Sequence, residues 1–97
     1  MYLIHVRLCR LVDGEPDQEM AREILAAAVP GEGVEHATVH RLSGREAVVG
    51  LFLRVESLVA AEKTAAAVCA RALSRHPAWG FVAVSCDAVL VWSFLER

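Results

Sequence analysis

The chain has 97 residues, a length that fits one domain. Hydrophobic residues make up 56% of it and charged residues 23%, which excludes an intrinsically disordered chain. The formal net charge of -2 argues against a nucleic-acid binder and against electrostatic anchoring on a membrane, since both need a basic face. Arginine supplies all of the basic charge except Lys63, a bias typical of a high-GC bacterial genome.

The cysteines bear on the cellular compartment. Cys9, Cys69 and Cys86 are odd in number, and no two of them have the C-x-x-C spacing of zinc and redox sites. A disulfide scaffold is therefore a poor fit, and we expect a reducing cytoplasm. His5 and Arg7 interrupt the apolar N-terminus, which argues against a signal peptide.

A long apolar segment, Ala78 to Leu95, approaches the length of a membrane span. Asp87 lies at its middle, where a carboxylate would cost about 2.5–3.5 kcal/mol on insertion scales. Val, Phe and Trp are frequent in the segment, and these residues suit strands. We therefore expect strands here and no membrane span.

The first part of the chain predicts a strand, a helix and a second strand. Apolar and polar residues alternate from Tyr2 to Val12, as in a strand. Pro16 suits the first turn of a helix, which we expect to end near Ala28 because Pro30 disfavours helical geometry just before it. A second strand is expected at Val34 to Leu42, followed by a short turn.

The middle of the chain predicts a third strand and a long helix. Ala47 to Val55 is apolar on both faces, as in a central strand of a sheet with both faces covered. Ser57 is a suitable N-cap for a helix that runs to about Ser74 and ends at His76-Pro77. Its buried side is expected to carry Leu58, Ala61, Ala65, Val68, Cys69 and Ala72.

The last part predicts a fourth strand at Phe81 to Cys86, a break near Asp87 and a fifth extended piece at Val89 to Phe94. The whole chain, 1–97, is then a single α+β domain of order βαββαβ with an extended C-terminal tail. Two right-handed crossovers place both helices on one face of a four-stranded antiparallel sheet, which is the ferredoxin-like plait.

Two helices cover only one face of such a sheet. The other face is expected to carry Leu3, Leu11 and one apolar side of the third strand, a patch too large to leave in water. A second copy of the same sheet, related by a two-fold axis, is the most economical cover. We therefore predict a homodimer, with the tail and its Trp92 reaching onto the partner.

This arrangement resembles the dimeric α+β barrel superfamily, which includes antibiotic-biosynthesis monooxygenases, muconolactone isomerases and YCII-related proteins. The start Tyr2-Leu3-Ile4-His5-Val6 carries the resemblance, together with the stretch from Val48 to Leu58, which looks like that superfamily's junction between a strand and a Ser-capped helix. The resemblance implies the fold and dimerisation. It leaves the activity open, since no catalytic motif of a member family can be placed on this chain.

Histidines are the first candidates for chemistry. His36 and His40 flank Thr38 on one face of the second strand, about 13 Å apart, which is too far for both to bind one metal ion. His5 lies on another strand. We therefore expect no metal site, and exposed histidines on an edge strand.

Asp87 stands among apolar neighbours, so it marks a turn or bulge, or else lines a cavity as a buried carboxylate. Each cysteine is expected to be structural. Cys9 lies in the first strand and Cys69 on the buried side of the second helix, and Cys86 has no histidine near it in sequence to act as a base. Gly31-x-Gly33 precedes a strand and is therefore not a phosphate loop. No cofactor is expected.

Two functions follow for this domain. The first is a non-catalytic homodimeric accessory or binding module, with a protein partner or a small hydrophobic ligand. The alternative is a cofactor-independent enzyme of the dimeric α+β barrel type, a monooxygenase or isomerase. It would hold a small hydrophobic substrate between the sheet and the helices, with His5, His36, His40 or Asp87 as acid–base groups. Such an enzyme needs an internal cleft lined by these residues, which the binding module does not.

Overall fold

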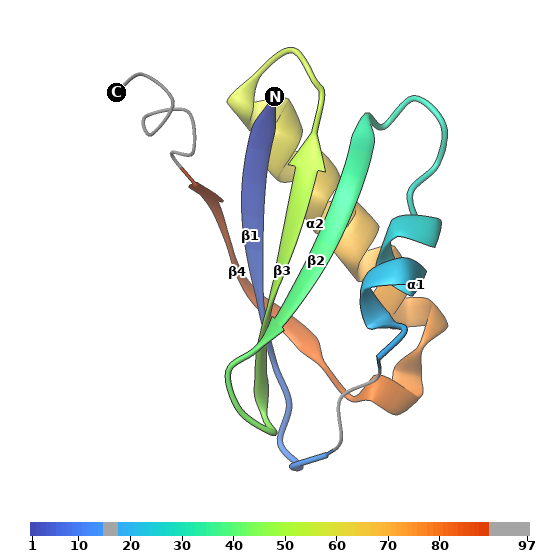
Figure 1. The fold of residues 1–97 in the computed structure, drawn as a ribbon, viewed down its shortest axis with the longest axis vertical. Coiled ribbons are helices and arrows are strands. Elements are labelled where there is room, and N and C mark those ends of the chain that lie inside the picture. Colours follow the sequence, from blue (N-terminus) through green and yellow to red (C-terminus); the bar gives the residue numbers. More distant parts are fainter. Residues whose placement is uncertain (15–17, 90–97) are drawn as a thin grey trace.

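The computed structural model describes residues 1–14 and 18–89. Its elements follow the order βαββαβ, with one short 3-10 helix before the last strand (Figure 1). They are β1 (Tyr2–Cys9), α1 (Met20–Ala26), β2 (Val34–Arg41), β3 (Glu46–Leu53), α2 (Leu58–Arg75), η1 (Pro77–Trp79) and β4 (Val82–Val89). The predicted element order is confirmed.

The four strands form one sheet in the order β2-β3-β1-β4, and every neighbouring pair is antiparallel. Both helices lie on the same side of this sheet (Figure 1). The chain therefore has the predicted α+β ferredoxin-like plait. Strand β3 lies inside the sheet between β2 and β1, as its apolar sequence indicates, but helices cover only one of its faces.

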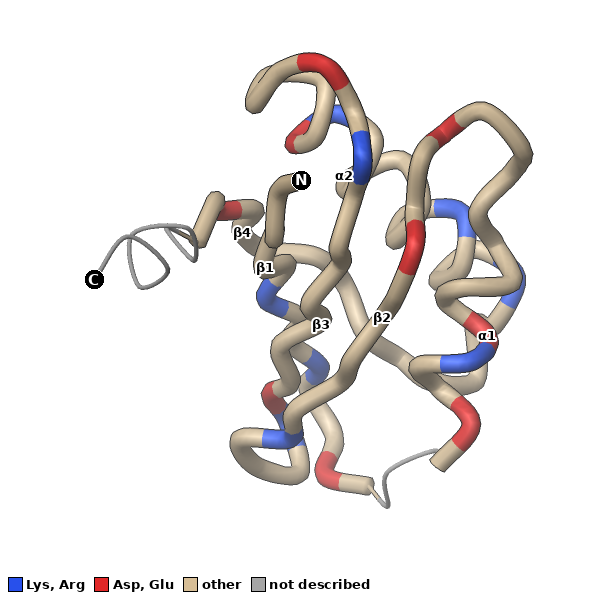
Figure 2. Tube along the Cα trace, turned by 45° about the horizontal axis from the view of Figure 1, so that its top comes forward, with Lys and Arg blue, Asp and Glu red and all other residues tan. Residues whose placement is uncertain are grey.

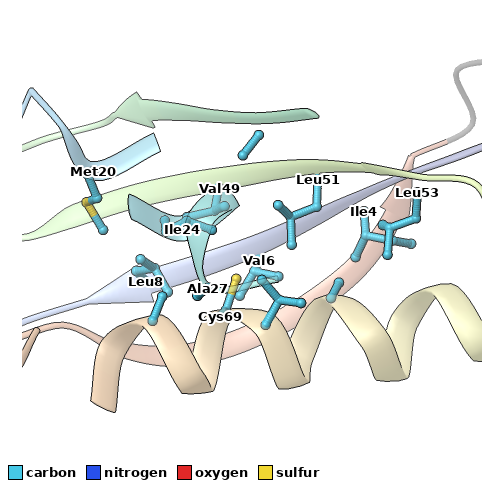
Figure 3. Packing of buried hydrophobic residues seen from close by; sticks show 14 of the residues in the cluster. Ile4, Val6, Leu8, Met20, Ile24, Ala27, Val49, Leu51, Leu53 and Cys69 are labelled. Atoms are coloured by element: carbon cyan, nitrogen blue, oxygen red, sulfur yellow. The ribbon is translucent and has the colours of Figure 1, made fainter. Parts of the chain in front are cut away.

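The core lies between the sheet and the helices (Figure 3). Alternate residues of β1 and β3 point into it, because side chains along a strand alternate between its two faces. Helix α2 contributes mainly small side chains, which allow it to approach the sheet closely. The fully buried strand residues are Ile4, Leu8, Ala47, Val49, Leu51 and Leu53, and those of α2 are Ala61, Ala65, Val68 and Ala72.

The ends of the helices agree with the sequence only in part. Ser57 is the N-cap of α2, and its Oγ accepts a hydrogen bond from the backbone N–H of Ala60 at 3.1 Å. Leu58, expected on the buried side, is instead 42% exposed because it lies in the first turn, beyond the edge of the core. Helix α1 ends at Ala26, and the expected start of the helix at Pro16 lies outside the described residues.

The predicted break near Asp87 is wrong. Strand β4 runs through it without interruption, and Asp87 pairs with His5 of β1. The irregularity lies earlier, where the register shifts between Arg7 and Leu8 and leaves Val84 as an additional residue. Asp87 does not end the strand because its carboxylate points to the uncovered face and stays in water. The expected fifth piece beyond Val89 lies outside the described residues. Among the described helices, none is long and apolar enough to cross a bilayer.

Arg71 of α2 ties the helix layer together. Its Nη1 donates to the carbonyl of Ala27 at 2.7 Å and to Oε1 of Glu32 at 3.0 Å, and its Nη2 donates to Oε2 of Glu32 at 3.1 Å. Oε1 of Glu32 also accepts the backbone N–H of Val29 at 2.8 Å. One guanidinium therefore joins α2, the end of α1 and the loop before β2.

This ion pair predicts an acid-dependent loss of stability. The Arg71 hydrogen bonds and, next, the Val29 N–H hold the pKa of Glu32 below its ordinary value of 4.5. The unfolded chain then binds more protons than the folded one just below pH 4.5, so the stability present at neutral pH falls as the pH drops through the lowered pKa. E32Q is expected to melt at a lower temperature than the wild type at pH 7. Its melting temperature is expected to fall less than that of the wild type on acidification.

Thermal unfolding followed by circular dichroism between pH 7 and pH 3 measures both effects. E56Q is the control, since Glu56 is an exposed acid with no hydrogen bond or ion pair among the described residues. An E32Q protein whose acid dependence equals that of the wild type would contradict the assignment.

Candidate functional site

The face of the sheet that lies opposite the helices, here called the open face, gathers the chemically interesting residues. Strand register and alternation place them there, since each pairs across the sheet with another residue of the same face. The open face carries Leu3, His5 and Arg7 from β1, His36, Thr38 and His40 from β2, Val48, Gly50 and Phe52 from β3, and Ser85 and Asp87 from β4.

All four candidates, His5, His36, His40 and Asp87, therefore lie on the open face. They do not line the space between the sheet and the helices in which the alternative enzyme would hold its substrate. Apolar side chains fill that space, and in the described part of the chain no polar or charged residue is buried. The reason is periodicity: His5 stands between Ile4 and Val6, whose side chains point inward, so the side chain of His5 points outward.

One row of residues crosses the open face at mid-height. Thr38 pairs with Gly50, Gly50 with His5, and His5 with Asp87. A Cβ at position 50 would lie 2.6 Å from Oγ1 of Thr38, so the threonine would have to move, and it would be in ordinary contact with Cδ2 of His5 at 3.6 Å. The side chains of Thr38 and His5 therefore lean over this glycine and approach each other from either side.

His5 and Asp87 stand directly opposite each other on β1 and β4. Such cross-strand neighbours have Cβ atoms about 5 Å apart, within reach of an imidazole–carboxylate hydrogen bond that would orient the ring as a general base. In the described residues, however, no ion pair or hydrogen bond joins the two side chains, and Asp87 is exposed. His5 and Asp87 are therefore close enough to form an acid–base pair, but no hydrogen bond joins them in the structure.

His36 and His40 are exposed on the edge strand β2, as expected. The ring of His36 lies 5.9 Å from the ring of Phe52, a tilted contact that covers part of the aromatic side chain. Within residues 1–14 and 18–89, no three His, Cys, Asp or Glu side chains come together in a way that could hold a metal ion. The structure therefore brings His5 close to Asp87 but keeps His36 and His40 apart from both.

Two of the three cysteines, Cys69 and Cys86, have thiols that are harder to deprotonate than usual. Burial raises the pKa of the Cys69 thiol to about 12. Burial, followed by the negative charges of Glu62 and Asp87, also raises the pKa of Cys86, whose Sγ donates to the carbonyl of Glu62 at 3.7 Å. Among the described residues, no cation lowers the pKa of either thiol.

Hydrophobic side chains surround the polar row. Leu3, Val48 and Phe52 are half-buried on the open face, and Val82 of β4 is 60% exposed. Leu11, expected here as well, lies beyond the end of β1 and is 89% exposed. The open face is therefore apolar at Leu3, Val48 and Phe52, and it carries the charges of Arg7 and Asp87 beside these residues.

Sequence reasoning missed Arg10, which fixes one end of the sheet. Its Nε donates to the carbonyl of Gly44 at 2.8 Å, its Nη1 donates to the carbonyl of Trp79 at 3.0 Å, and its guanidinium lies 4.4 Å from the ring centre of Phe81. The two hydrogen-bond acceptors, Gly44 and Trp79, are 34 and 69 residues away from Arg10 in sequence, so no local sequence pattern reveals these contacts.

Comparisons with known proteins do not assign a family. No protein-family model matches the chain, and a search of curated proteins finds no match. Any function therefore has to be argued from the geometry of the open face.

Proposed function

We propose that the chain works as a non-catalytic, homodimeric binding module and that two copies associate through their open faces. The observation that supports this most is the apolar strip of Leu3, Val48 and Phe52, which lies in the middle of the sheet on the side that neither described helix covers. Burying apolar surface of this kind contributes about 25 cal/mol per Å².

The size of the open face bears on how large a dimer interface can be. Each of the four strands has eight residues, so the sheet spans roughly 19 Å by 26 Å, or about 490 Å² in the plane of the sheet. The open face would thus supply the centre of an interface, and residues at its rim would have to contribute for each partner to bury the roughly 800 Å² of a standard interface. The resemblance to the dimeric α+β barrel superfamily adds to the proposal, since it implies association of this kind.

The alternative, a cofactor-independent monooxygenase or isomerase, receives less support. His36, His40 and Asp87 are exposed, and a filled core occupies the place where a substrate was expected. In the proposed dimer the helix layer of each copy faces outward. The exposed Leu58 and Val59 of α2 would then be available to a protein partner.

A matched pair of substitutions tests the association. The wild type is expected to sediment at twice the mass of one chain. V48D places a carboxylate inside the proposed interface and is expected to raise the dissociation constant of the dimer about a hundredfold or more, because an unpaired charge is costly to bury. V59D makes the same change on α2, at a side chain that is 61% exposed on the other side of the molecule, and is expected to leave the mass unchanged.

Sedimentation velocity over a range of concentrations gives the masses, and far-ultraviolet circular dichroism verifies that both variants fold. A wild type that stays at the mass of one chain at every concentration would overturn the proposal. So would a V48D variant that remains as dimeric as V59D.

A further inference from the structure

Two opposite charges on the open face have no ion-pair partner among the residues that the structure describes. Arg7 of β1 pairs across the sheet with Val48 on one side and Ser85 on the other, and Asp87 of β4 pairs with His5. Both charged residues are exposed, and within the described residues neither forms an ion pair. Figure 2 shows a basic position on β1 and an acidic position on β4, in a sheet that carries few charges.

Their placement suits a two-fold symmetric contact. Arg7 and Asp87 lie on adjacent strands and are offset by two residues, since Arg7 is opposite Ser85 and Asp87 is opposite His5. Diagonal neighbours of this kind are about 7–8 Å apart. A two-fold axis that lies between two such faces exchanges the projected positions of these points if it passes midway between them and is perpendicular to the line that joins them. The same axis then places Arg7 of each copy over Asp87 of the other.

We propose that two reciprocal ion pairs, Arg7 with Asp87 of a second copy, set the orientation in which two open faces pack together. This inference rests on the proposed dimer and names how its two copies recognise each other. Symmetry makes the contact isologous, so each dimer contains the pair twice. The apolar strip supplies most of the affinity, whereas the charges select the register and disfavour other orientations.

Glu46 is a competing partner on the open face, where it pairs with Cys9 near the β2–β3 turn. It is half-buried, however, and lies at the end of β3, whereas Asp87 is exposed and adjacent to the middle of β1. If Arg7 paired with Glu46 of the second copy instead of Asp87, a different substitution would rescue R7E. The experiment therefore includes substitutions of both acidic residues.

Charge reversal tests the pairing. R7E and D87R each convert two attractive contacts in the dimer into two repulsive ones, and each is expected to raise the dissociation constant about tenfold or more. The double variant R7E/D87R restores opposite charges and is expected to return within about threefold of the wild type. R75E is the matched control, since it makes the same charge change at the exposed end of α2 in the helix layer.

Sedimentation equilibrium at low and high salt gives each dissociation constant, and circular dichroism verifies folding. Weakening by both single variants with rescue in the double variant supports the pairing. The neutral pair R7Q and D87N, which changes the surface less, is expected to flatten the salt dependence. Single variants that dimerise as well as R75E would overturn the ion pairs while the dimer itself stands. Rescue of R7E by E46R instead of D87R would also overturn them, and a monomeric wild type would remove the dimer on which they rest.

Discussion

Replacing Leu51 by alanine is expected to lower the free energy of unfolding by about 2–5 kcal/mol, the cost of removing a fully buried leucine side chain. Leu51 has no solvent exposure and lies on β3 opposite Ile4 on one side and Ala37 on the other, facing the helices. Native domains of this size have only about 5–15 kcal/mol in total, so L51A should remove a large share of the stability of the chain.

Urea unfolding followed by circular dichroism measures the change. V59A is the control: Val59 is 61% exposed on α2, so its truncation should change the free energy of unfolding by less than about 0.5 kcal/mol. Measurements at two protein concentrations separate the loss of core packing from any effect of association, since only the latter depends on concentration. Equal midpoints for L51A and V59A would contradict the packing of β3 against the helices.

The fold was predictable because the strongest signals in this chain are local. In β1 the inward Ile4, Val6 and Leu8 alternate with outward residues without exception, and β3 repeats the pattern. The side-chain period of two is a property of any extended backbone, so it shows which faces meet the helices before any partner strand is known. The Ser57 cap is equally local, since its acceptor and donor are three residues apart.

The errors lie where solvent exposure decides the outcome. A carboxylate among apolar residues predicts a break if both faces of the strand are covered, but β4 is an edge strand with one uncovered face, and Asp87 uses it. Sequence alone does not reveal which strand lies at the edge. The prediction that Leu58 is buried failed for a related reason. The apolar side of α2 continues into the first turn of the helix, which lies beyond the edge of the core.

The row of Thr38, Gly50, His5 and Asp87 could not be predicted, because it depends on strand order and on register. The bulge at Val84 shifts the pairing of β4 by one residue, and a shift of one residue moves a side chain to the other face of the sheet. The sequence of β4 carries no signal for that bulge. Arg71 was missed for a different reason, since its partner Glu32 is 39 residues away.

Cys69 is expected to resist alkylation in the folded protein almost completely. Burial raises the pKa of its thiol from an ordinary 9.0 to about 12, which lowers the thiolate population at pH 8 about a thousandfold, and only the thiolate is nucleophilic. Folding also excludes the reagent from a side chain that is 1% exposed. Iodoacetamide treatment followed by mass spectrometry of peptides should therefore find Cys69 unmodified in buffer and fully modified in urea.

Cys9 is the internal control in the V48D variant, whose open face is not covered by a second copy, because it is half-buried on the strand face away from the core and should there be modified first. Rapid modification of Cys69 in the folded protein would show that α2 opens from the sheet, and it would contradict a rigid helix layer. The expected protection bears on function as well. Burial makes the Cys69 thiol a poor nucleophile in the folded chain, and the pKa of Cys86 is raised as well. On the open face, the proposed association and any acid–base role of His5 would compete for the same surface.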